Sequence, residues 1–408
     1  HLVLTLPRSL DRAALARSLE LLASRHPILG CTVDADASGA RWRPGTTAPA
    51  LVWDDAAGAV PALDARTGPT CRAIHESTPA GHRLRFGVHH AITDGVGVLL
   101  LADDLRRIYC ATVRGEDPRP DVDWSPRTID ALLDAHGIGI GERVTMAWAG
   151  QRRWAAGAPS THADAGGIAG AAPPRYQPVS FSTAALDTIV ASAGARGWRP
   201  SHLLLAALAV AWSRAIGPSA DPMSTSGWLV GVNARRPLHT VRGAGNLSGF
   251  EPVALRDVET RPLAAIVDDA RDAFAPFRTL GAGMLGELGA PLVRATPAAV
   301  LNRAMTTLFE TQAASTRYTR AFSAVEIPDH IGDWGDSQAD AAWCEPVDDV
   351  PAPSSAFVLT TFRGTVTCSP GAAPSVISPD EAAALFTATN AALTELAGSL
   401  SPVARAAR

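Results

Sequence analysis

The sequence predicts an α+β fold in two lobes, and three observations lead to that prediction. Both halves carry a mixture of strand-like and helix-like segments. The stretch AAGAPSTHADAGGIAGAAPP at 155–174 is small, rich in glycine and proline, and nearly aperiodic. The chain has 408 residues, of which 47% are hydrophobic, which is enough for more than one core. We therefore expect an N-terminal lobe at 1–155, a crossing linker at 156–175 and a C-terminal lobe at 176–408. A lid or a disordered segment is the alternative interpretation of the linker.

The first half predicts a sheet with two helices. The apolar run HLVLTL indicates a strand that Pro7 ends, and the apolar spacing from Leu10 to Leu22 indicates a helix that stops at RHP. Further segments follow from alternation and apolar periodicity: strands at 28–33, 40–43, 71–74 and 82–90, and a helix at 95–109. The segment VHHAITDG at 88–95 therefore falls on a corner between a strand and a helix, where rigid elements often present side chains to a site.

The second half predicts another sheet with longer helices. Ser201 is the expected N-cap of a long apolar helix, and Gly217 is its expected stop. The remaining predicted elements are strands at 177–181, 228–232 and 251–255, helices at 184–195, 263–274 and 379–398, and a hairpin of 356–362 with 366–369. No sequence repeat relates the two halves.

Composition excludes several classes of protein. The formal net charge is −4, and the basic runs are no longer than arginine pairs, so a nucleic-acid-binding surface is not expected. The five cysteines form no CxxC pair, which indicates reduced thiols and a cytoplasmic protein. No apolar run approaches 18 residues, so we expect no membrane span.

The residues His89, His90, Asp94 and Gly95 form an HHxxxDG pattern. This pattern resembles the signature of the chloramphenicol-acetyltransferase-like superfamily, which includes nonribosomal peptide condensation domains, polyketide-associated acyltransferases, plant BAHD acyltransferases and wax ester synthases. Residues 11–33 resemble the family's first helix and the start of the strand after it, and 323–336 resemble its late loop. The resemblance implies two chloramphenicol-acetyltransferase-like lobes in a V-shaped pseudo-dimer with a channel between them. Ser201-His202 stands where wax ester synthases usually have an Asn-Asp pair, which disfavours that branch.

The resemblance assigns roles to the motif residues. It implies that His90 is a general base, since an imidazole near neutral pKa can take a proton from an attacking hydroxyl or amine. His89 is expected to be a packing or hydrogen-bonding neighbour, because adjacent strand residues point to opposite faces. Asp94 could orient the imidazole, as a triad aspartate does. The resemblance instead implies a structural ion pair with an arginine of the second half, Arg235 or Arg236. Gly95 is expected to allow a tight corner or a close approach of substrate.

Other residues are weaker candidates. Asn246 and Ser248 lie in a Gly-rich turn and could bind substrate or simply form the turn. Trp334 could line an acyl tunnel or lie in an exposed loop. Asn233 lies near a strand end, and His202 is expected to face solvent or cap its helix. The sequence lacks a GxSxG elbow and a GxxxxGK[ST] loop, and HHxxxD without further ligands does not predict a metal site.

These observations predict a bacterial acyltransferase of secondary metabolism or lipid tailoring. Its donor would be an acyl thioester of coenzyme A or of a carrier protein's phosphopantetheine arm, used as substrate without a resident cofactor. The acceptor would be a small alcohol, and we expect a monomer. Two alternatives stay open: an amide-forming condensation enzyme acting on carrier-bound substrates, and a non-catalytic binding module that kept the fold.

Overall fold

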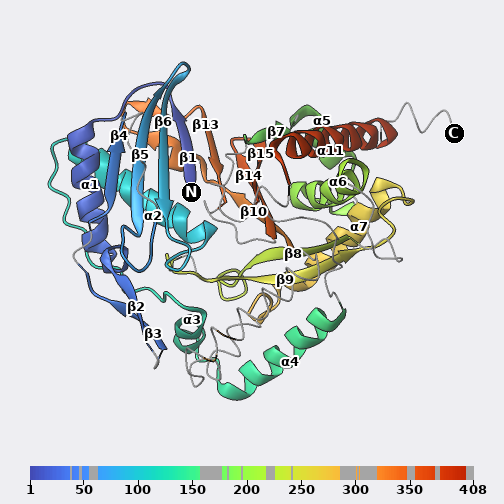
Figure 1. The fold of residues 1–408 in the computed structure, drawn as a ribbon, viewed down its shortest axis with the longest axis horizontal. Coiled ribbons are helices and arrows are strands. Elements are labelled where there is room, and N and C mark those ends of the chain that lie inside the picture. The colour runs from blue at the N-terminus through green and yellow to red at the C-terminus, as the bar shows by residue number, and fades with distance from the viewer. Residues whose placement is uncertain are drawn as a thin grey trace.

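A computed structural model places two sheets side by side, each with its own helices (Figure 1). The structure describes residues 1–36, 39–45, 48–54, 63–156, 177–181, 183–193, 196–216, 226–239, 242–284, 300, 303, 319–346, 354–372 and 377–400. The predicted linker at 156–175 lies outside the described residues except for its first position, so the proposed division into lobes stays a prediction.

The first sheet has five strands in the order β13-β1-β6-β5-β4. Its pairs are antiparallel except for β4 and β5, which run parallel. The strands are β1 (Leu2–Leu6), β4 (Ala50–Trp53), β5 (Cys71–Thr78), β6 (Gly81–Val88) and β13 (Ala341–Cys344). The helices α1 (Arg12–Arg25) and α2 (Gly95–Val113) pack against each other beside this sheet. The side chain of Asp11 caps α1 by accepting from Ala14 N.

The second sheet has six strands in the order β7-β15-β14-β10-β8-β9. The central strand β10 runs parallel to both of its neighbours, whereas the outer pairs are antiparallel. The strands are β7 (Val179–Phe181), β8 (Ser226–Asn233), β9 (Ser248–Leu255), β10 (Thr319–Glu326), β14 (Ser354–Phe362) and β15 (Thr365–Ala372). The helices on this side are α5 (Thr183–Ser192), α6 (Pro200–Ala215), α7 (Leu263–Phe274) and α11 (Pro379–Leu400). Mixed strands and helices around both sheets confirm the α+β prediction.

Several shorter elements connect these layers. The strands β2 (Thr32–Asp36) and β3 (Gly39–Arg43) form a separate hairpin, and β11 (Asp333–Trp334) pairs with β12 (Ser337–Gln338). The helices α3 (Ile129–Ala135) and α4 (Ile140–Ala156) follow α2 along the chain. Single turns in the described residues include η1 (Pro27–Gly30), η3 (Ala275–Arg278) and η4 (Asp329–Gly332).

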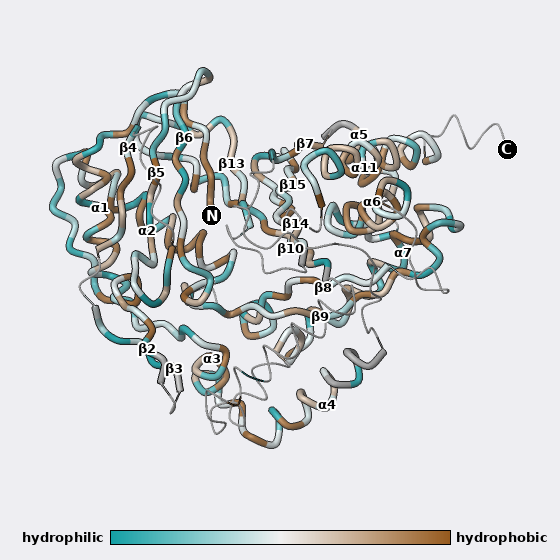
Figure 2. Tube along the Cα trace, viewed as in Figure 1, coloured by the Kyte–Doolittle hydropathy of each residue, from teal (hydrophilic) through white to brown (hydrophobic). Residues whose placement is uncertain are grey.

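Each sheet has its own hydrophobic core, visible as brown segments along the inner helices and strands (Figure 2). The core of the second sheet is centred on α6, which is apolar on nearly all sides. The core of the first sheet also takes residues from the second half, including Val325, Ile331 and Trp334. The strand β13 pairs with β1 in the same way, with Leu2 opposite Cys344. The second half therefore helps to build the first sheet, which the sequence did not indicate.

Several predicted boundaries are wrong, among them the following three. The strand expected at 28–33 begins only at Thr32, because Pro27 starts the single turn η1. The strand expected at 82–90 ends at Val88. The N-cap of α6 is Arg199 rather than Ser201, since Pro200 takes the first helical position that suits its fixed φ. The expected stop at Gly217 lies outside the described residues.

Candidate functional site

The two motif histidines lie just beyond the end of β6. The backbone of His89 still donates to Thr70 O at 2.8 Å, and Ile92 N then donates to His89 O at 2.9 Å to close a turn. Because both histidines follow the strand, strand alternation does not set their orientations, so that reason for separating their roles does not apply.

His89 is held within its own turn. Its Nδ1 accepts from Ala91 N at 3.1 Å, so the neutral ring carries its proton on Nε2. Burial lowers the pKa of His89, the nearby His90 lowers it further, and Asp64 acts in the opposite direction. A half-buried imidazole that accepts a hydrogen bond within its own turn fits the role of a structural neighbour of His90.

His90 is exposed, and its described contacts come from the second half of the chain. The amide Nδ2 of Asn246 lies 3.3 Å from His90 Nδ1 and donates to His90 O at 3.0 Å. Asn246 was a candidate for substrate binding, but the structure places it against the motif histidine. The two residues are 156 positions apart, so no local sequence pattern could indicate this contact.

Asp94 is buried and does not contact His90. It is the N-cap of α2, with Oδ1 accepting from Gly97 N at 2.7 Å. Its Oδ2 accepts from Leu247 N at 2.7 Å and from Arg235 Nη1 at 2.8 Å. Oδ1 therefore caps α2, whereas Oδ2 joins α2 to the loop after β8.

Arg235, and not Arg236, pairs with Asp94. The residue is 2% exposed, and all five N–H groups of its guanidinium have acceptors. Nη1 donates to Asp94 and to Asn233 Oδ1, and the other nitrogens donate to the carbonyl oxygens of Gly243 and Gly245. A buried charge with complete hydrogen bonding is the arrangement that makes a buried ion pair tolerable.

The glycine that the corner requires is Gly97 rather than Gly95. A Cβ on Gly95 would meet Val325 at an ordinary 3.4 Å. A Cβ on Gly97 would lie 2.0 Å from Thr93 Oγ1 and 2.9 Å from the carbonyl oxygen of Ala244. Gly97 thus allows α2 to approach the second half closely. The expectation that a tight corner requires glycine at position 95 is therefore wrong.

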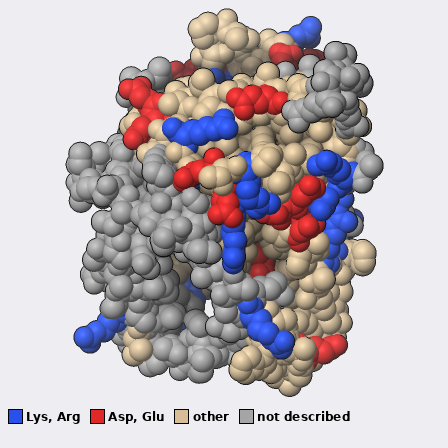
Figure 3. All heavy atoms as spheres, turned by 90° about the vertical axis from the view of Figure 1, so that its right-hand side faces the viewer, with Lys and Arg blue, Asp and Glu red and all other residues tan. Residues whose placement is uncertain are grey.

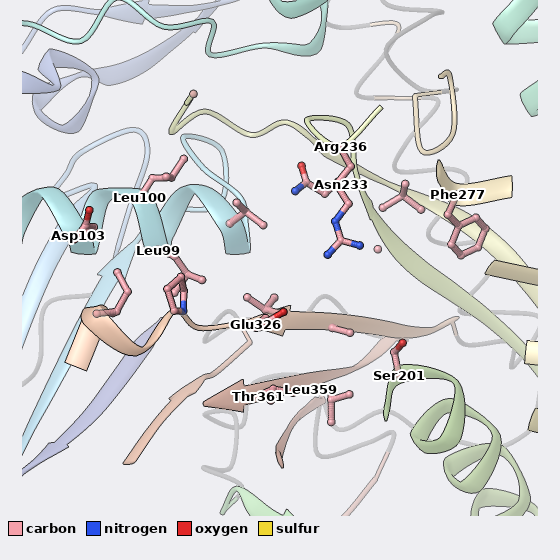
Figure 4. Close-up of a pocket in the computed structure, with 18 of the residues that line it drawn as sticks. Leu99, Leu100, Asp103, Ser201, Asn233, Arg236, Phe277, Glu326, Leu359 and Thr361 are labelled. Atoms are coloured by element: carbon pink, nitrogen blue, oxygen red, sulfur yellow. The ribbon is translucent and has the colours of Figure 1, made fainter. Parts of the chain in front are cut away.

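A cavity of about 1330 Å³ lies between α2 and the second sheet (Figure 4). Leu99, Leu100 and Asp103 line it from α2, whereas Leu359 and Thr361 line it from β14. His90 is not among the lining residues. The cavity reaches Val96 near the motif, and Gly243 and Ala244 in the loop that also carries Asn246. The motif corner and the cavity therefore share a wall.

The other candidates lie in different places. Asn233 lines the cavity, and Ser248 is its partner in the β8–β9 register but does not line it. Trp334 is 1% exposed, donates to Ile331 O at 3.0 Å and packs on Tyr109 at a centroid distance of 5.5 Å. It belongs to the core of the first sheet, so the expectation of a tunnel-lining or exposed tryptophan is wrong for this cavity.

His202 lies in the cavity wall at the start of α6 and is only 6% exposed, so it does not face solvent. The other alternative, that it caps its helix, is confirmed, because its ring bonds to the backbone of the N-cap residue Arg199. Its Nδ1 accepts from Arg199 N at 3.2 Å, and its ring lies edge-on to Phe274. Burial, together with the charges of Arg199, Arg271 and Arg278, lowers the pKa of His202 to about 4.

This pKa predicts a specific acid sensitivity. Between pH 6.5 and 4 the unfolded chain binds a proton at His202 that the native protein does not bind, so stability falls as pH falls through this window. The loss attributable to His202 between pH 7.5 and 4.5 should be about 2–3 kcal/mol. Urea unfolding of the wild type and of His202→Asn at both pH values measures it. The variant should lose less stability than the wild type; equal losses in the two proteins would contradict the prediction.

Within the described ranges, no group of three or more His, Cys, Asp or Glu side chains is arranged to hold a metal ion. Among the same residues, no helix combines the length and apolar character needed to cross a bilayer.

The structure is similar to several solved structures at low sequence identity. One is polyketide synthase associated protein 5 from Mycobacterium tuberculosis, with 14% identity, 98% of this chain and 94% of that chain covered, and a TM-score of 0.65. Another is a mutant of the starter condensation domain of rhizomide synthetase in complex with C8-CoA and Leu-SNAC, with 15% identity, coverage of 97% and 88%, and a TM-score of 0.64. A third is the epimerization domain from the third module of tyrocidine synthetase B, with 12% identity, coverage of 98% and 91%, and a TM-score of 0.63.

No protein-family model matches the sequence, and no curated protein matches it significantly. The similarity to solved structures extends over nearly the whole chain and confirms the expected chloramphenicol-acetyltransferase-like fold, as found in condensation domains. A condensation domain and an epimerization domain both share this fold, so the choice of reaction depends on the site residues.

Proposed function

We propose that this protein transfers an acyl group from a thioester to a hydroxyl acceptor, with His90 as general base. The observation that carries the proposal is the exposed His90 imidazole on a corner that shares a wall with the cavity of about 1330 Å³. A cavity of this volume has room for an acyl thioester and a small acceptor together. The fold is also that of a condensation domain whose structure contains C8-CoA.

The chemistry requires no covalent enzyme intermediate. The acceptor hydroxyl attacks the thioester carbonyl carbon while the imidazole takes its proton. The tetrahedral intermediate then expels the thiolate, which receives the proton from the imidazolium. The products are an ester and a free thiol, and His90 returns to its neutral form.

Asn246 contacts one of the two ring nitrogens of His90, Nδ1, so we assign proton abstraction to the other, Nε2. The reactive tautomer then carries its proton on Nδ1, where the ring cannot accept a hydrogen bond from the Asn246 amide. In that tautomer Asn246 positions His90 through the bond that its amide donates to His90 O. The contribution of Asp94 is structural, because both of its oxygens are occupied by Gly97, Leu247 and Arg235.

The proposal is tested by measuring thiol release from octanoyl-coenzyme A with and without a panel of small alcohols. We expect release that requires both substrates and an ester product in mass spectrometry, because direct transfer needs the acceptor to be bound. Release without an acceptor would indicate a hydrolase instead.

The amide-forming alternative predicts a different result in the same assay. It predicts no turnover with free coenzyme A thioesters, and turnover with an amine acceptor when the acyl group is attached to a carrier protein. A binding module predicts no thiol release under any of these conditions.

A further inference from the structure

The charged side chains of the cavity are unevenly distributed. On the α2 side the carboxylates of Asp103 and Asp104 are paired. Asp103 Oδ1 lies 2.8 Å from Arg106 Nη2, and Asp103 Oδ2 lies 2.8 Å from Arg107 Nη2. Asp104 Oδ2 lies 2.8 Å from Arg25 Nε. Elsewhere the cavity is lined by five more arginines, Arg199, Arg236, Arg242, Arg271 and Arg278, of which Arg271 is paired with Asp268 and Asp272. We call Arg199, Arg236 and Arg278 the arginine cluster. They come from three segments: the residue before α6, the turn after β8, and the turn η3.

The arginine cluster is not neutralised by carboxylates. All three side chains are exposed, and none forms an ion pair with a carboxylate in the part of the chain that the structure describes. Glu326 also lines the cavity, but no ion pair joins it to the cluster. On the face shown in Figure 3, by contrast, several arginines lie beside acidic side chains. Figure 4 shows Arg236 projecting into the cavity on the side facing Ser201.

Arg199 experiences the positive charges of the other two members of the cluster. Desolvation lowers the pKa of Arg199, and the charges of Arg278 and Arg236 lower it further. Burial and the charges of Arg199, Arg271 and Arg278 also lower the pKa of the neighbouring His202. An anion placed among these groups would relieve this repulsion.

The same wall contains the N-terminus of α6, a helix of 16 residues. The side chain of the N-cap residue Arg199 accepts no hydrogen bond from this turn, His202 Nδ1 accepts only from Arg199 N, and Pro200 lacks an N–H group. Among the described residues, nothing accepts from Ser201 N–H. Ser201 N–H and the positive end of the helix dipole therefore face the side of the cavity that the arginine cluster lines.

We propose that the arginine cluster and the first turn of α6 bind a phosphate group of the substrate. The inference deepens the proposed acyl transfer and rests on it for the identity of that substrate, a thioester carried by a phosphorylated arm. Phosphate suits the site better than a single carboxylate, because its charge and three free oxygens can be shared among several guanidinium groups and a backbone N–H. Coenzyme A and a carrier-bound phosphopantetheine arm both supply such a group.

Direct binding tests this site without requiring turnover. Calorimetric titrations would compare pantetheine, 4′-phosphopantetheine and adenosine 3′,5′-bisphosphate on the wild type, on R199Q/R236Q/R278Q, and on a matched control. The control R17Q/R43Q/R119Q removes three arginines that pair with acids on the surface outside the cavity, so its change in net charge is the same.

We expect the phosphorylated probes to bind the wild type and the control equally, and pantetheine to bind both more weakly. The cluster variant should weaken binding of the phosphorylated probes by at least about 100-fold, on the order of tenfold for each charge-assisted hydrogen bond that the variant removes. Tight binding of 4′-phosphopantetheine supports a single-phosphate subsite, and a requirement for the bisphosphate nucleotide supports a coenzyme A subsite. Equal weakening in both triple variants, or no preference for phosphorylated probes, would overturn the proposal. His90→Ala should leave this binding intact, so failure of the catalytic proposal would be seen separately.

Discussion

Replacing His90 with alanine should lower kcat by about 10²–10⁴-fold, the usual contribution of a positioned general base. The fold should survive, because His90 is exposed and its removal opens no core cavity. Surface substitutions of this kind usually change stability by no more than about 0.5 kcal/mol. The measurement is thiol release with an alcohol acceptor, together with a urea unfolding curve for each protein.

His82→Ala is the matched control, since it removes a histidine from the opposite end of the same strand β6. It should leave kcat unchanged. Asn246→Ala should lower kcat by only about five- to tenfold, because it removes a positioning hydrogen bond and not the proton acceptor. Full activity in His90→Ala would remove the basis of the proposed mechanism.

The motif corner was predictable because it depends on local sequence. The end of an apolar strand, followed by two histidines and a capping aspartate at the start of a helix, indicated the location of His90 and Asp94 in the fold. The pairing of Asp94 with one of two adjacent arginines also followed from the resemblance. Choosing Arg235 over Arg236 needed the structure, because the backbone after β8 decides which side chain turns inward.

Long-range pairings were not predictable. The strand β13 joins the first sheet through β1, although more than three hundred residues separate Leu2 from its partner Cys344. Short apolar strands such as AAWC carry no information about which sheet they join. The contact between Asn246 and His90, and the approach of Gly97 to Ala244, are likewise set by how the halves pack. These contacts determine the site geometry, so the site was less predictable than the fold class.

Breaking the ion pair between Asp94 and Arg235 should produce the largest loss of stability. Asp94→Ala leaves the Arg235 charge buried without its anion, and it removes the acceptor of Gly97 N and Leu247 N. Removing one partner of a buried pair typically costs about 3–5 kcal/mol. Asp117→Ala is the control, because it breaks an exposed pair with Arg119 that should contribute at most about 1 kcal/mol. Urea unfolding followed by circular dichroism and tryptophan fluorescence measures both.

The double variant D94A/R235M separates the ion pair from the individual side chains. If the charges stabilise each other, the double variant should be less destabilised than the sum of the single variants, because no uncompensated charge remains buried. The same proteins also decide between the two roles considered for Asp94. A triad aspartate would cost activity while the unfolding curve stayed the same. A structural aspartate that holds α2 to the loop carrying Asn246 should lose stability and activity together, because His90 then loses the partner that positions it.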